Sequence, residues 1–276
     1  MADHTALMEE TLVALLKDKK YFSLRDILST MNPADIAAIF DGLEEARLPL
    51  LFRLLPKELA ADAFVEMEPE AQELLIQGFS DSELREVLDE IYVDDAVDIV
   101  EEMPANVVRR ILAQADPDMR KQINEILRYP EDSAGSIMTT EYVTLRPNMT
   151  VEEAIKRIRR TGVDKETIYT CYVTENRRLI GMCTVKDLLL CDDDDEVIAE
   201  IMEENVISVN TLEDKEDVAQ MFSKYDFLAL PVVDAEGRLV GIVTFDDAMD
   251  VMEDEVTEDM EKMAAMLPSE KPYMRS

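Results

Sequence analysis

The sequence predicts two folded parts: an all-helical superhelical domain built as an α-hairpin solenoid, then an α/β domain of two βαββα units that continues into an acidic exit helix. Three observations lead to this prediction. Apolar residues recur at spacings of three and four through residues 5–128, one pattern is written twice in residues 136–256, and a single acidic helical run extends from Asp246 to Met266. With 276 residues, the chain has room for two domains with cores of their own.

The first half carries helix-start signals at nearly even intervals. Residues typical of helix N-termini recur every 23 to 25 residues, and further breaks fall between them. This spacing fits helical hairpins stacked along a solenoid, which typically serve as contact surfaces and not as catalytic pockets. The main signals are Asn32-Pro33, Leu55-Pro56, Ser80-Asp81 and Met103-Pro104, and the breaks between them are Asp41-Gly42, Glu68-Pro69, Val93-Asp94 and Asp116-Pro117.

The two copies of the repeated pattern begin at Ser136 and Glu200, each followed by Ile-Met. Each copy is expected to hold a short strand, a helix with an acidic first turn and two further strands, and neither has enough core to be stable alone. We expect the helices to open at Thr150 and Thr211. The expected strands are 142–145, 170–174 and 179–185 in the first copy, and 206–209, 229–233 and 239–245 in the second.

The closing strand of each copy ends in the spacing Gly-x-x-Thr-x-x-Asp. Because Thr and Asp lie three apart where a strand passes into a helix, both can face one cleft. There the carboxylate can accept hydrogen bonds from ribose hydroxyls, and the hydroxyl with backbone N–H groups can meet a phosphate. The alternative is that each Thr caps its helix and each Asp occupies the favourable first turn. The residues concerned are Gly181, Thr184 and Asp187, then Gly241, Thr244 and Asp247.

Net charge restricts the partners of this chain. Its 62 acidic residues against 28 Lys and Arg give a net charge of −34, which argues against binding to nucleic acid or to an anionic lipid surface. Such a charge destabilises the compact state by self-repulsion unless cations neutralise it, so cation binding is the first functional indication. A generally acidic cytosolic protein and a salt-adapted protein are the alternatives.

Side chains suited to catalysis are few. The sole histidine, His4, lies close to the N-terminus, which removes the usual general base and most zinc chemistry. Cys171 and Cys183 fall on expected inner strands and, together with Cys191, lack metal-ligand spacing, so we expect reduced thiols in a cytosolic protein. We recognise neither a signal peptide nor the roughly 18–20 continuous apolar residues of a membrane span.

Acidic residues gather in three places. Asp94 and Asp98 lie four apart at an expected helix start and therefore share a face; N-capping explains Asp94 or Asp95 but not Asp98 one turn later. The other two clusters are Glu216, Asp226, Asp246, Asp247 and Asp250 beside the second copy, and Asp254, Glu255, Glu258, Asp259 and Glu261 on the exit helix.

The exit helix carries a stripe of like charge, because acids recur three or four apart from Asp247 to Glu261 with only Lys262 as a nearby cation. Each like-charge pair costs about 0.2–0.5 kcal/mol, so the stripe favours a bound counter-charge; a solvated acidic helix is the alternative. Mg²⁺ fits scattered acids, since it keeps several waters and takes only one or two carboxylates. The run Asp192–Asp195 lacks the Gly and the spacing of a calcium EF-hand and is expected to be a solvated loop.

Residues 136–256 resemble the cystathionine-β-synthase (CBS) domain pair, a ligand-sensing module of two βαββα units. With the acidic helical region before it and the acidic helix after it, the whole chain resembles the cytosolic part of the MgtE family of magnesium channels. Family members continue into a plug helix and a membrane pore, and this sequence stops where that segment would begin. We expect either the soluble part of such a protein or a regulatory protein without a pore. The matching stretches are Tyr129 to Val143 with Ala134-Gly135-Ser136-Ile137-Met138-Thr139, Tyr225 to Phe227, Leu230 to Asp234, and Gly241 to Asp259.

The resemblance implies domain boundaries and ligands. The domains are a helical MgtE N-domain (1–129), a linker (130–135), two CBS domains (136–196 and 197–256) and the end of the exit helix with a tail (257–276). The matching positions for Mg²⁺ are Asp62, Asp94, Asp98, Glu216, Ser223 through its carbonyl, Asp226, Asp247, Asp250, Glu255, Glu258 and Asp259. ATP is the candidate second ligand, and its matching positions are Tyr169, Lys186, Asp187, Phe227 and Pro231.

We therefore expect a non-enzymatic, magnesium-sensing regulatory region at the cytoplasmic face of the cell membrane. It is expected to form a homodimer through the CBS pair and to act on the family's transmembrane pore domain. At low Mg²⁺ the acidic surfaces would repel one another; at high Mg²⁺ ions would bridge Asp94 and Asp98 to Asp247 and its neighbours, compacting the assembly and closing the pore. The rival hypothesis is an adenine-nucleotide-sensing CBS module whose helical domain is a docking scaffold without a metal role. An enzyme has the least support.

Overall fold

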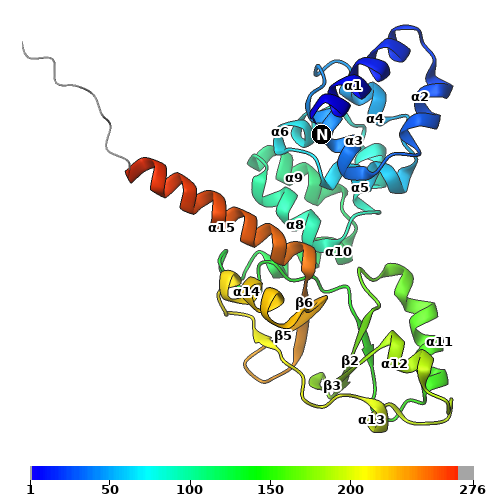
Figure 1. The fold of residues 1–276 in the computed structure, drawn as a ribbon, viewed down its shortest axis with the longest axis vertical. Helices are drawn as coiled ribbons and strands as arrows, with labels where there is room; N and C mark the ends of the chain where they lie inside the picture. The colour runs from blue at the N-terminus through cyan, green and yellow to red at the C-terminus, as the bar shows by residue number, and fades with distance from the viewer. Residues whose placement is uncertain (1, 267–276) are drawn as a thin grey trace, which may run out of the picture. The chain divides into compact units, whose positions relative to one another are not determined.

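The computed structural model describes residues 2–266, with the side chains of residues 8–257 and of Met260. Two compact units divide the chain after Asn124. The first unit is all helical, and the second holds two three-stranded sheets with flanking helices and the long helix α15 (Figure 1). The predicted fold class is therefore confirmed.

Four helices of the first unit begin where the main sequence signals predict, whereas α4 begins at Leu48, six residues after the predicted break at Asp41-Gly42. The side chain of Asn32 caps α3, and Ser80 forms a reciprocal capping box with Glu83 at the start of α7. Helices α5 and α9 begin directly after Pro56 and Pro104. The elements are α1 (Ala2–Lys17), α2 (Tyr21–Leu28), α3 (Pro33–Asp41), α4 (Leu48–Phe52), α5 (Lys57–Val65), α6 (Pro69–Gly78), α7 (Asp81–Leu88), α8 (Val93–Glu102), α9 (Ala105–Gln114) and α10 (Pro117–Ile126).

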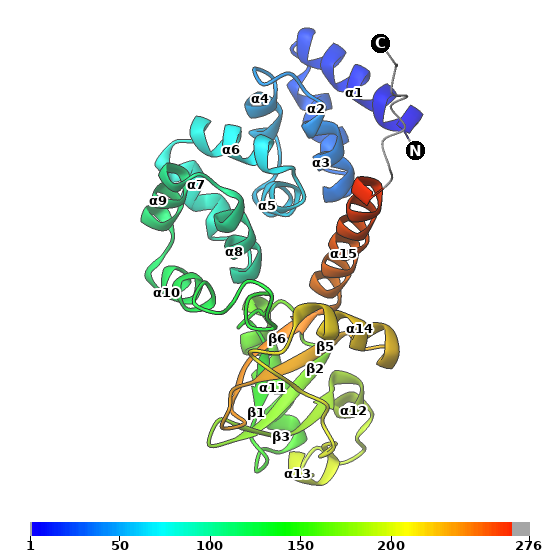
Figure 2. The same ribbon diagram turned by 90° about the vertical axis from the view of Figure 1, so that its left-hand side faces the viewer.

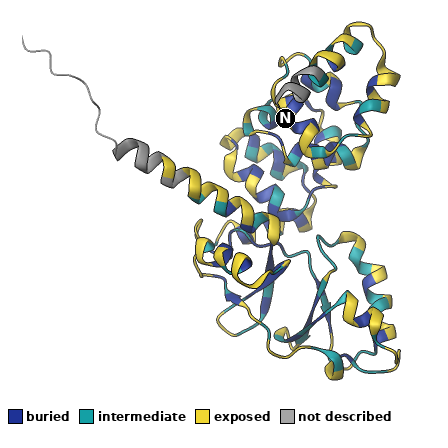
Figure 3. Cartoon of the chain, viewed as in Figure 1, coloured by how far each residue is buried: buried dark blue, intermediate teal, exposed yellow. Residues whose placement is uncertain are grey.

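Alternate helices of this unit pack in succession, α3 on α5, α5 on α7 and α7 on α9. Their buried faces turn toward one another, whereas the outer faces are exposed (Figure 3). The rings of Phe52, Phe64 and Phe79 pack together with centroids 5.3 to 6.4 Å apart. This stepwise packing of each hairpin on the next is the arrangement expected of a solenoid.

The two repeats of the second unit have the same topology. In each, the first strand pairs in parallel with the second, which pairs antiparallel with the third. The first repeat contains β1 (Val143–Leu145), α11 (Val151–Thr161), the 3-10 helix η1 (Gly162–Asp164), β2 (Thr170–Glu175), β3 (Arg178–Thr184) and α12 (Val185–Leu190). The second contains α13 (Ile198–Ile201), β4 (Val209–Asn210), α14 (Lys215–Tyr225), β5 (Ala229–Val233), β6 (Leu239–Thr244) and α15 (Phe245–Met266).

Strand register is also the same in both repeats. Cys171 lies opposite Cys183, and Leu230 lies opposite Val243 at the equivalent place. In both repeats the register shifts directly after the residue pair that contains the strand glycine. The side chains on the inner face form one core per repeat, and a smaller cluster around Tyr172 joins the two. There the Tyr172 ring meets the Tyr142 ring edge-on, with centroids 6.2 Å apart.

Two predictions about the start of the second repeat are wrong. Residues 206–208 are not a strand, and only Val209–Asn210 pairs with β5. The reason is that Glu203, just before this stretch, pairs with Met182 of the first repeat and so directs the backbone there. Thr211 does not cap a helix: its N–H donates to Val233 O (3.1 Å), which keeps the backbone extended. Asp214 caps α14 instead, accepting from the N–H groups of the second and third residues after it.

Gly181 and Gly241 allow the lead-in segment of each repeat to cross the sheet of the other. Met182 exchanges backbone hydrogen bonds with Glu203, and Ile242 does so with Thr139. A Cβ at Gly241 would lie 2.5 Å from Met138 Sδ and 2.9 Å from Thr139 O; one at Gly181 would lie 2.6 Å from Met202 Sδ. The glycine of the repeated motif therefore serves the close approach of a backbone segment.

Candidate metal and nucleotide sites

Helices α14 and α15 both carry predicted metal ligands and pack against each other. The two helices pack side by side (Figures 1 and 2), and the rings of Phe222 and Phe245 are 6.5 Å apart between them. Glu216 is exposed in the first turn of α14, and Asp226 is exposed at its C-cap. On α15, Asp250 is exposed one turn after the partly buried Asp247. Eight of the eleven predicted metal ligands thus belong to this pair of packed helices, with Asp226 counted as the C-cap of α14.

The end of α14 also contains the predicted carbonyl ligand Ser223. Asp226 adopts the left-handed conformation (φ 55°, ψ 40°), which ends the helix. Ser223 lies in the last turn, where carbonyl oxygens have no partner further along the helix. Its predicted role as a carbonyl ligand is compatible with that position.

Asp247 is held in place by the preceding strand end. Thr244 Oγ1 donates to Asp247 Oδ2 at 2.5 Å, and Thr244 is buried. In the first repeat, Asp187 N donates to Thr184 Oγ1, while Asp187 Oδ2 accepts from Thr184 N and Oγ1, a complete capping box. The capping interpretation is therefore confirmed for the first copy. In the first copy the cap uses only Oδ2 of the Asp187 carboxylate.

The remaining α15 acids differ in how far they are described. Glu255 is partly buried and Asp254 is exposed, whereas the side chains of the predicted ligands Glu258 and Asp259 lie outside the described residues. The sequence places no Lys or Arg between Phe245 and Glu261. The acidic stripe therefore lies on a continuous helix, α15. That helix has no basic residue before Lys262 that could neutralise the stripe.

In the helical unit, three predicted ligands lie on two helices. Asp94 is buried and Asp98 exposed, one turn apart on α8. Asp62 lies on the exposed side of α5, where partial desolvation and then the charge of Glu58 raise its pKa above the ordinary value. A buried carboxylate such as Asp94 needs a compensating partner, since burying an isolated charge is costly.

The predicted nucleotide residues form two separate groups. Tyr169 O accepts from Val185 N (3.0 Å), so Tyr169 lies beside the first turn of α12, which carries Lys186 and Asp187; all three side chains are exposed. Phe227 instead packs in the second repeat, with its ring 5.3 Å from that of Tyr225 and 6.3 Å from that of Phe222. Pro231 is buried in β5 opposite Ile242.

The cysteines are where the sequence predicts them. Cys171 and Cys183 are reduced and buried opposite each other on β2 and β3, and burial raises the pKa of both thiols to about 12. Such thiols are poor nucleophiles because they stay protonated.

Sequence reasoning missed one group of residues with binding chemistry. Arg146, after β1, and Arg157, on α11, line a hollow of about 640 Å³ at the edge of the first repeat. The available signal was the local excess of basic residues: residues 146–178 hold eight Lys or Arg and five Asp or Glu in an otherwise acidic chain.

Comparison with known proteins agrees with this architecture. The model of the MgtE intracellular N domain matches residues 31–132, and that of the CBS domain matches residues 134–193 and 198–254. A crystal structure of the cytosolic domain of the Mg²⁺ channel MgtE in complex with ATP has a TM-score of 0.82 and 39% identity, covering 88% of this chain and 99% of that one. The chain belongs to the MgtE family.

Further relatives support this assignment. A crystal structure of the soluble part of a magnesium transporter has a TM-score of 0.82 at 33% identity and covers 91% of this chain and 99% of that one. The magnesium transporter MgtE of Thermus thermophilus is 41% identical over 249 residues, 88% of this chain and 55% of that protein. That of Bacillus subtilis is 32% identical over 255 residues, 92% and 56% respectively. The chain thus spans about half the length of these curated relatives.

The described helices were also compared with the requirements of a membrane span. Within residues 2–266, none of them combines the length and the apolar character that crossing a bilayer requires.

Proposed function

We propose that this chain is a non-enzymatic magnesium-sensing region at the cytoplasmic face of the membrane, which binds Mg²⁺ on its acidic surfaces and passes the resulting compaction to the pore domain of an MgtE transporter. The observation that carries the proposal is the pair α14 and α15, whose carboxylates come from both helices with no basic residue of α15 before Lys262. A homodimer through the CBS pair belongs to the same proposal.

Electrostatics explains why Mg²⁺ would change the shape of this chain. With a net charge of −34, acidic surfaces repel one another across any solvent layer thinner than about 8–10 Å at physiological ionic strength. A divalent ion that keeps its waters can neutralise carboxylates of different helices without a compact preformed cage. Binding therefore favours the compact form by its differential affinity for it.

Small-angle scattering tests the proposal directly. We expect the radius of gyration of the chain to fall on addition of millimolar Mg²⁺ and to change much less in NaCl of equal ionic strength, because screening alone does not bridge carboxylates. An equal response to both salts would show general charge screening and would reject magnesium sensing.

Thermal melts of variants locate the ions. Binding stabilises the fold by RT ln(1 + [L]/Kd), about 2.7 kcal/mol at a hundredfold excess over Kd. Asp247→Asn should melt at or above the wild type without Mg²⁺, because a repulsion is removed, yet gain less when Mg²⁺ is added. The matched control is Asp195→Asn, in the exposed loop after α12, which should gain as much as the wild type. Equal gains in both variants would exclude Asp247 as a ligand.

We also propose that ATP binds the first repeat beside α12. Lys186 would meet the phosphates, Asp187 the ribose hydroxyls and Tyr169 the base, since these exposed side chains lie at one strand-to-helix junction. The similarity to an MgtE cytosolic domain in complex with ATP supports this proposal. Phe227 and Pro231 would belong to the site only if the nucleotide also reached the second repeat.

A further inference from the structure

We propose that the first repeat carries a second anion site, distinct from the α12 junction, where Arg146 and Arg157 bind a compact phosphate-bearing anion. Both arginines line two adjoining hollows of about 640 and 480 Å³. These volumes lie within the range of small-molecule pockets. The hollows lie at the end of β1 and β2 where Leu145 and Thr174 stand, whereas Tyr169 and Asp187 flank the opposite end of β2 and β3.

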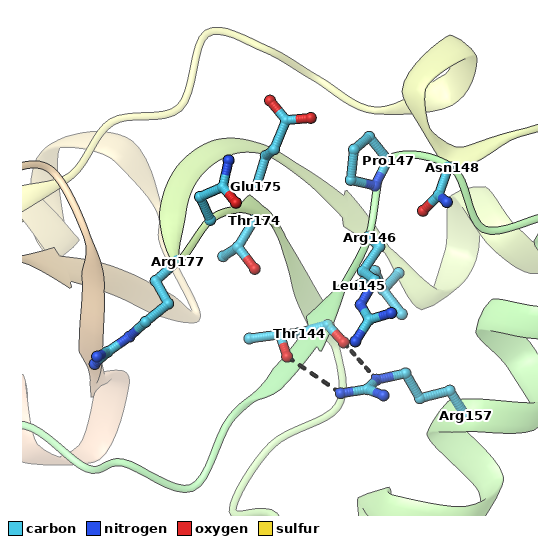
Figure 4. Close-up of a pocket in the computed structure, with 10 residues that line it drawn as sticks. Thr144, Leu145, Arg146, Pro147, Asn148, Arg157, Thr174, Glu175 and Arg177 are labelled. Carbon is cyan, nitrogen blue, oxygen red and sulfur yellow. Dashed lines mark hydrogen bonds between the residues drawn. The ribbon is translucent and has the colours of Figure 1, made fainter.

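Arg157 is fixed before any ligand arrives. Its Nε donates to Thr144 O at 2.7 Å and a terminal nitrogen to Thr144 Oγ1 at 3.4 Å, and the side chain is half-buried. In Figure 4 the guanidinium groups of Arg146 and Arg157 lie on the same side, near Thr144. Two guanidinium groups directed to one place repel each other, so an anion between them relieves the repulsion, and their planar donors suit phosphate oxygens.

The acids around the hollows do not neutralise these arginines. Among the described residues neither Arg146 nor Arg157 forms an ion pair with a carboxylate, although the chain has 62 acids. Glu153 accepts from Thr150 N in the capping box of α11. The carboxylate of Glu175 points away from both guanidinium groups (Figure 4).

The lining also indicates what kind of anion fits. Lys156 and Arg160 of α11 extend the basic wall into the second hollow, and Asn148 and Asn176 add amide groups. Among the described residues no aromatic side chain lines either hollow, so a nucleobase would find no ring to stack on there. A net charge of −34 disfavours approach to an anionic bilayer, so we commit to a small soluble anion of the pyrophosphate or sugar-phosphate class.

Calorimetry with inorganic pyrophosphate tests the site on the full chain. The buffer contains no Mg²⁺, so that neither Mg²⁺ binding to the protein nor Mg²⁺ binding to pyrophosphate contributes to the measured heat. We expect wild type to bind and Arg146→Gln to bind at least tenfold more weakly, which corresponds to about 1.4 kcal/mol. Glu175→Gln should bind at least as tightly as the wild type, because the Glu175 carboxylate points away from both guanidinium groups.

Matched controls separate this site from a general charge effect and from the proposed ATP site. Arg159→Gln removes an exposed arginine of α11 that lines neither hollow and should bind like the wild type, as should Asp187→Ala at the α12 junction. Circular dichroism verifies folding of each variant. The proposal is overturned if wild type gives no binding heat, if Arg146→Gln binds like Arg159→Gln, or if Asp187→Ala abolishes binding. Co-sedimentation with phosphatidylglycerol vesicles in the absence of pyrophosphate binding would point to a lipid headgroup and overturn it as well.

Discussion

The two repeats of the second unit share a scaffold but differ in charge. Strand order, register, the glycine crossing and the Thr–Asp contact occur in both. Residues 136–196 hold nine Lys or Arg and twelve Asp or Glu, whereas residues 197–256 hold three and sixteen. At equivalent positions after the closing strand, the first repeat has Lys186 and the second has Asp246.

This difference shows which features the duplicated fold requires and which it leaves open. A glycine is needed wherever the other repeat's lead-in segment crosses, and a cap is needed where a strand ends in a helix. Surface charge is not constrained by either, so one copy can present cations to phosphates and the other carboxylates to Mg²⁺. The proposed anion sites fall in the first repeat, and most of the predicted metal ligands in the second.

The largest expected effect comes from substituting the glycines at which the lead-in segment of one repeat crosses the sheet of the other. Gly241→Ala should lower the free energy of unfolding by about 1–3 kcal/mol, because a Cβ would overlap both the Met138 side chain and the Thr139 carbonyl. Gly181→Ala should cost less, since the nearest backbone atom there is 3.1 Å away. Urea denaturation measures both. Gly78→Ala, with nothing within 4 Å, is the control and should be neutral or stabilising.

The charge difference between the repeats can be tested by ATP titration. Lys186→Gln should weaken ATP binding about tenfold, or about 1.4 kcal/mol, because a phosphate partner is lost. Asp246→Asn at the equivalent place should leave the affinity unchanged if the first repeat alone binds the phosphates. A larger effect of Asp246→Asn than of Lys186→Gln would place the nucleotide in the second repeat.

A smaller effect is expected from the caps. Thr184→Ala should destabilise the protein by about 1 kcal/mol, because the complete capping box of α12 is lost. Thr211→Ala should destabilise the protein less, because Thr211 caps no helix and, within the described part of the chain, its hydroxyl makes a single long contact, 3.5 Å to Asn210 Oδ1. Thermal melts at neutral pH compare the two, and equal losses would contradict the assigned role of Thr184.

The smallest effect at neutral pH comes from the thiols of the first repeat, which the second repeat replaces with Leu230 and Val243. The pKa of Cys171 and Cys183 is about 12 in the folded chain, against about 8.5 when unfolded. Above pH 8.5 the unfolded state binds fewer protons, so their stabilising contribution is complete below that pH and is lost as pH rises toward 12. Alkylation at pH 8 should modify the partly exposed Cys191 first and the buried Cys171 and Cys183 only in denaturant; equal rates for all three would contradict the burial of Cys171 and Cys183.

The sequence by itself determined the fold class, most helix starts and the duplication. These follow from local physics: Asn32, Ser80 and Thr150 satisfy orphan N–H groups of their own helices, and the spacing of apolar residues sets each buried face. The acidic clusters of the second repeat could be recognised from the sequence, whereas the individual metal ligands, Ser223 among them, were named from the resemblance to the MgtE family, and their roles stay a prediction.

Only the tertiary structure decided what depends on segments that are distant in the chain. Residues 206–208 are not a strand and Thr211 is not a cap, because the pairing of Glu203 with Met182 and of Thr211 with Val233 sets that backbone. The role of Gly241 required the approach of Met138 and Thr139 from over a hundred residues away. The Arg146–Arg157 hollow likewise arises only when α11 packs beside the end of β1, since no local pattern specifies which non-neighbouring side chains will share a cavity.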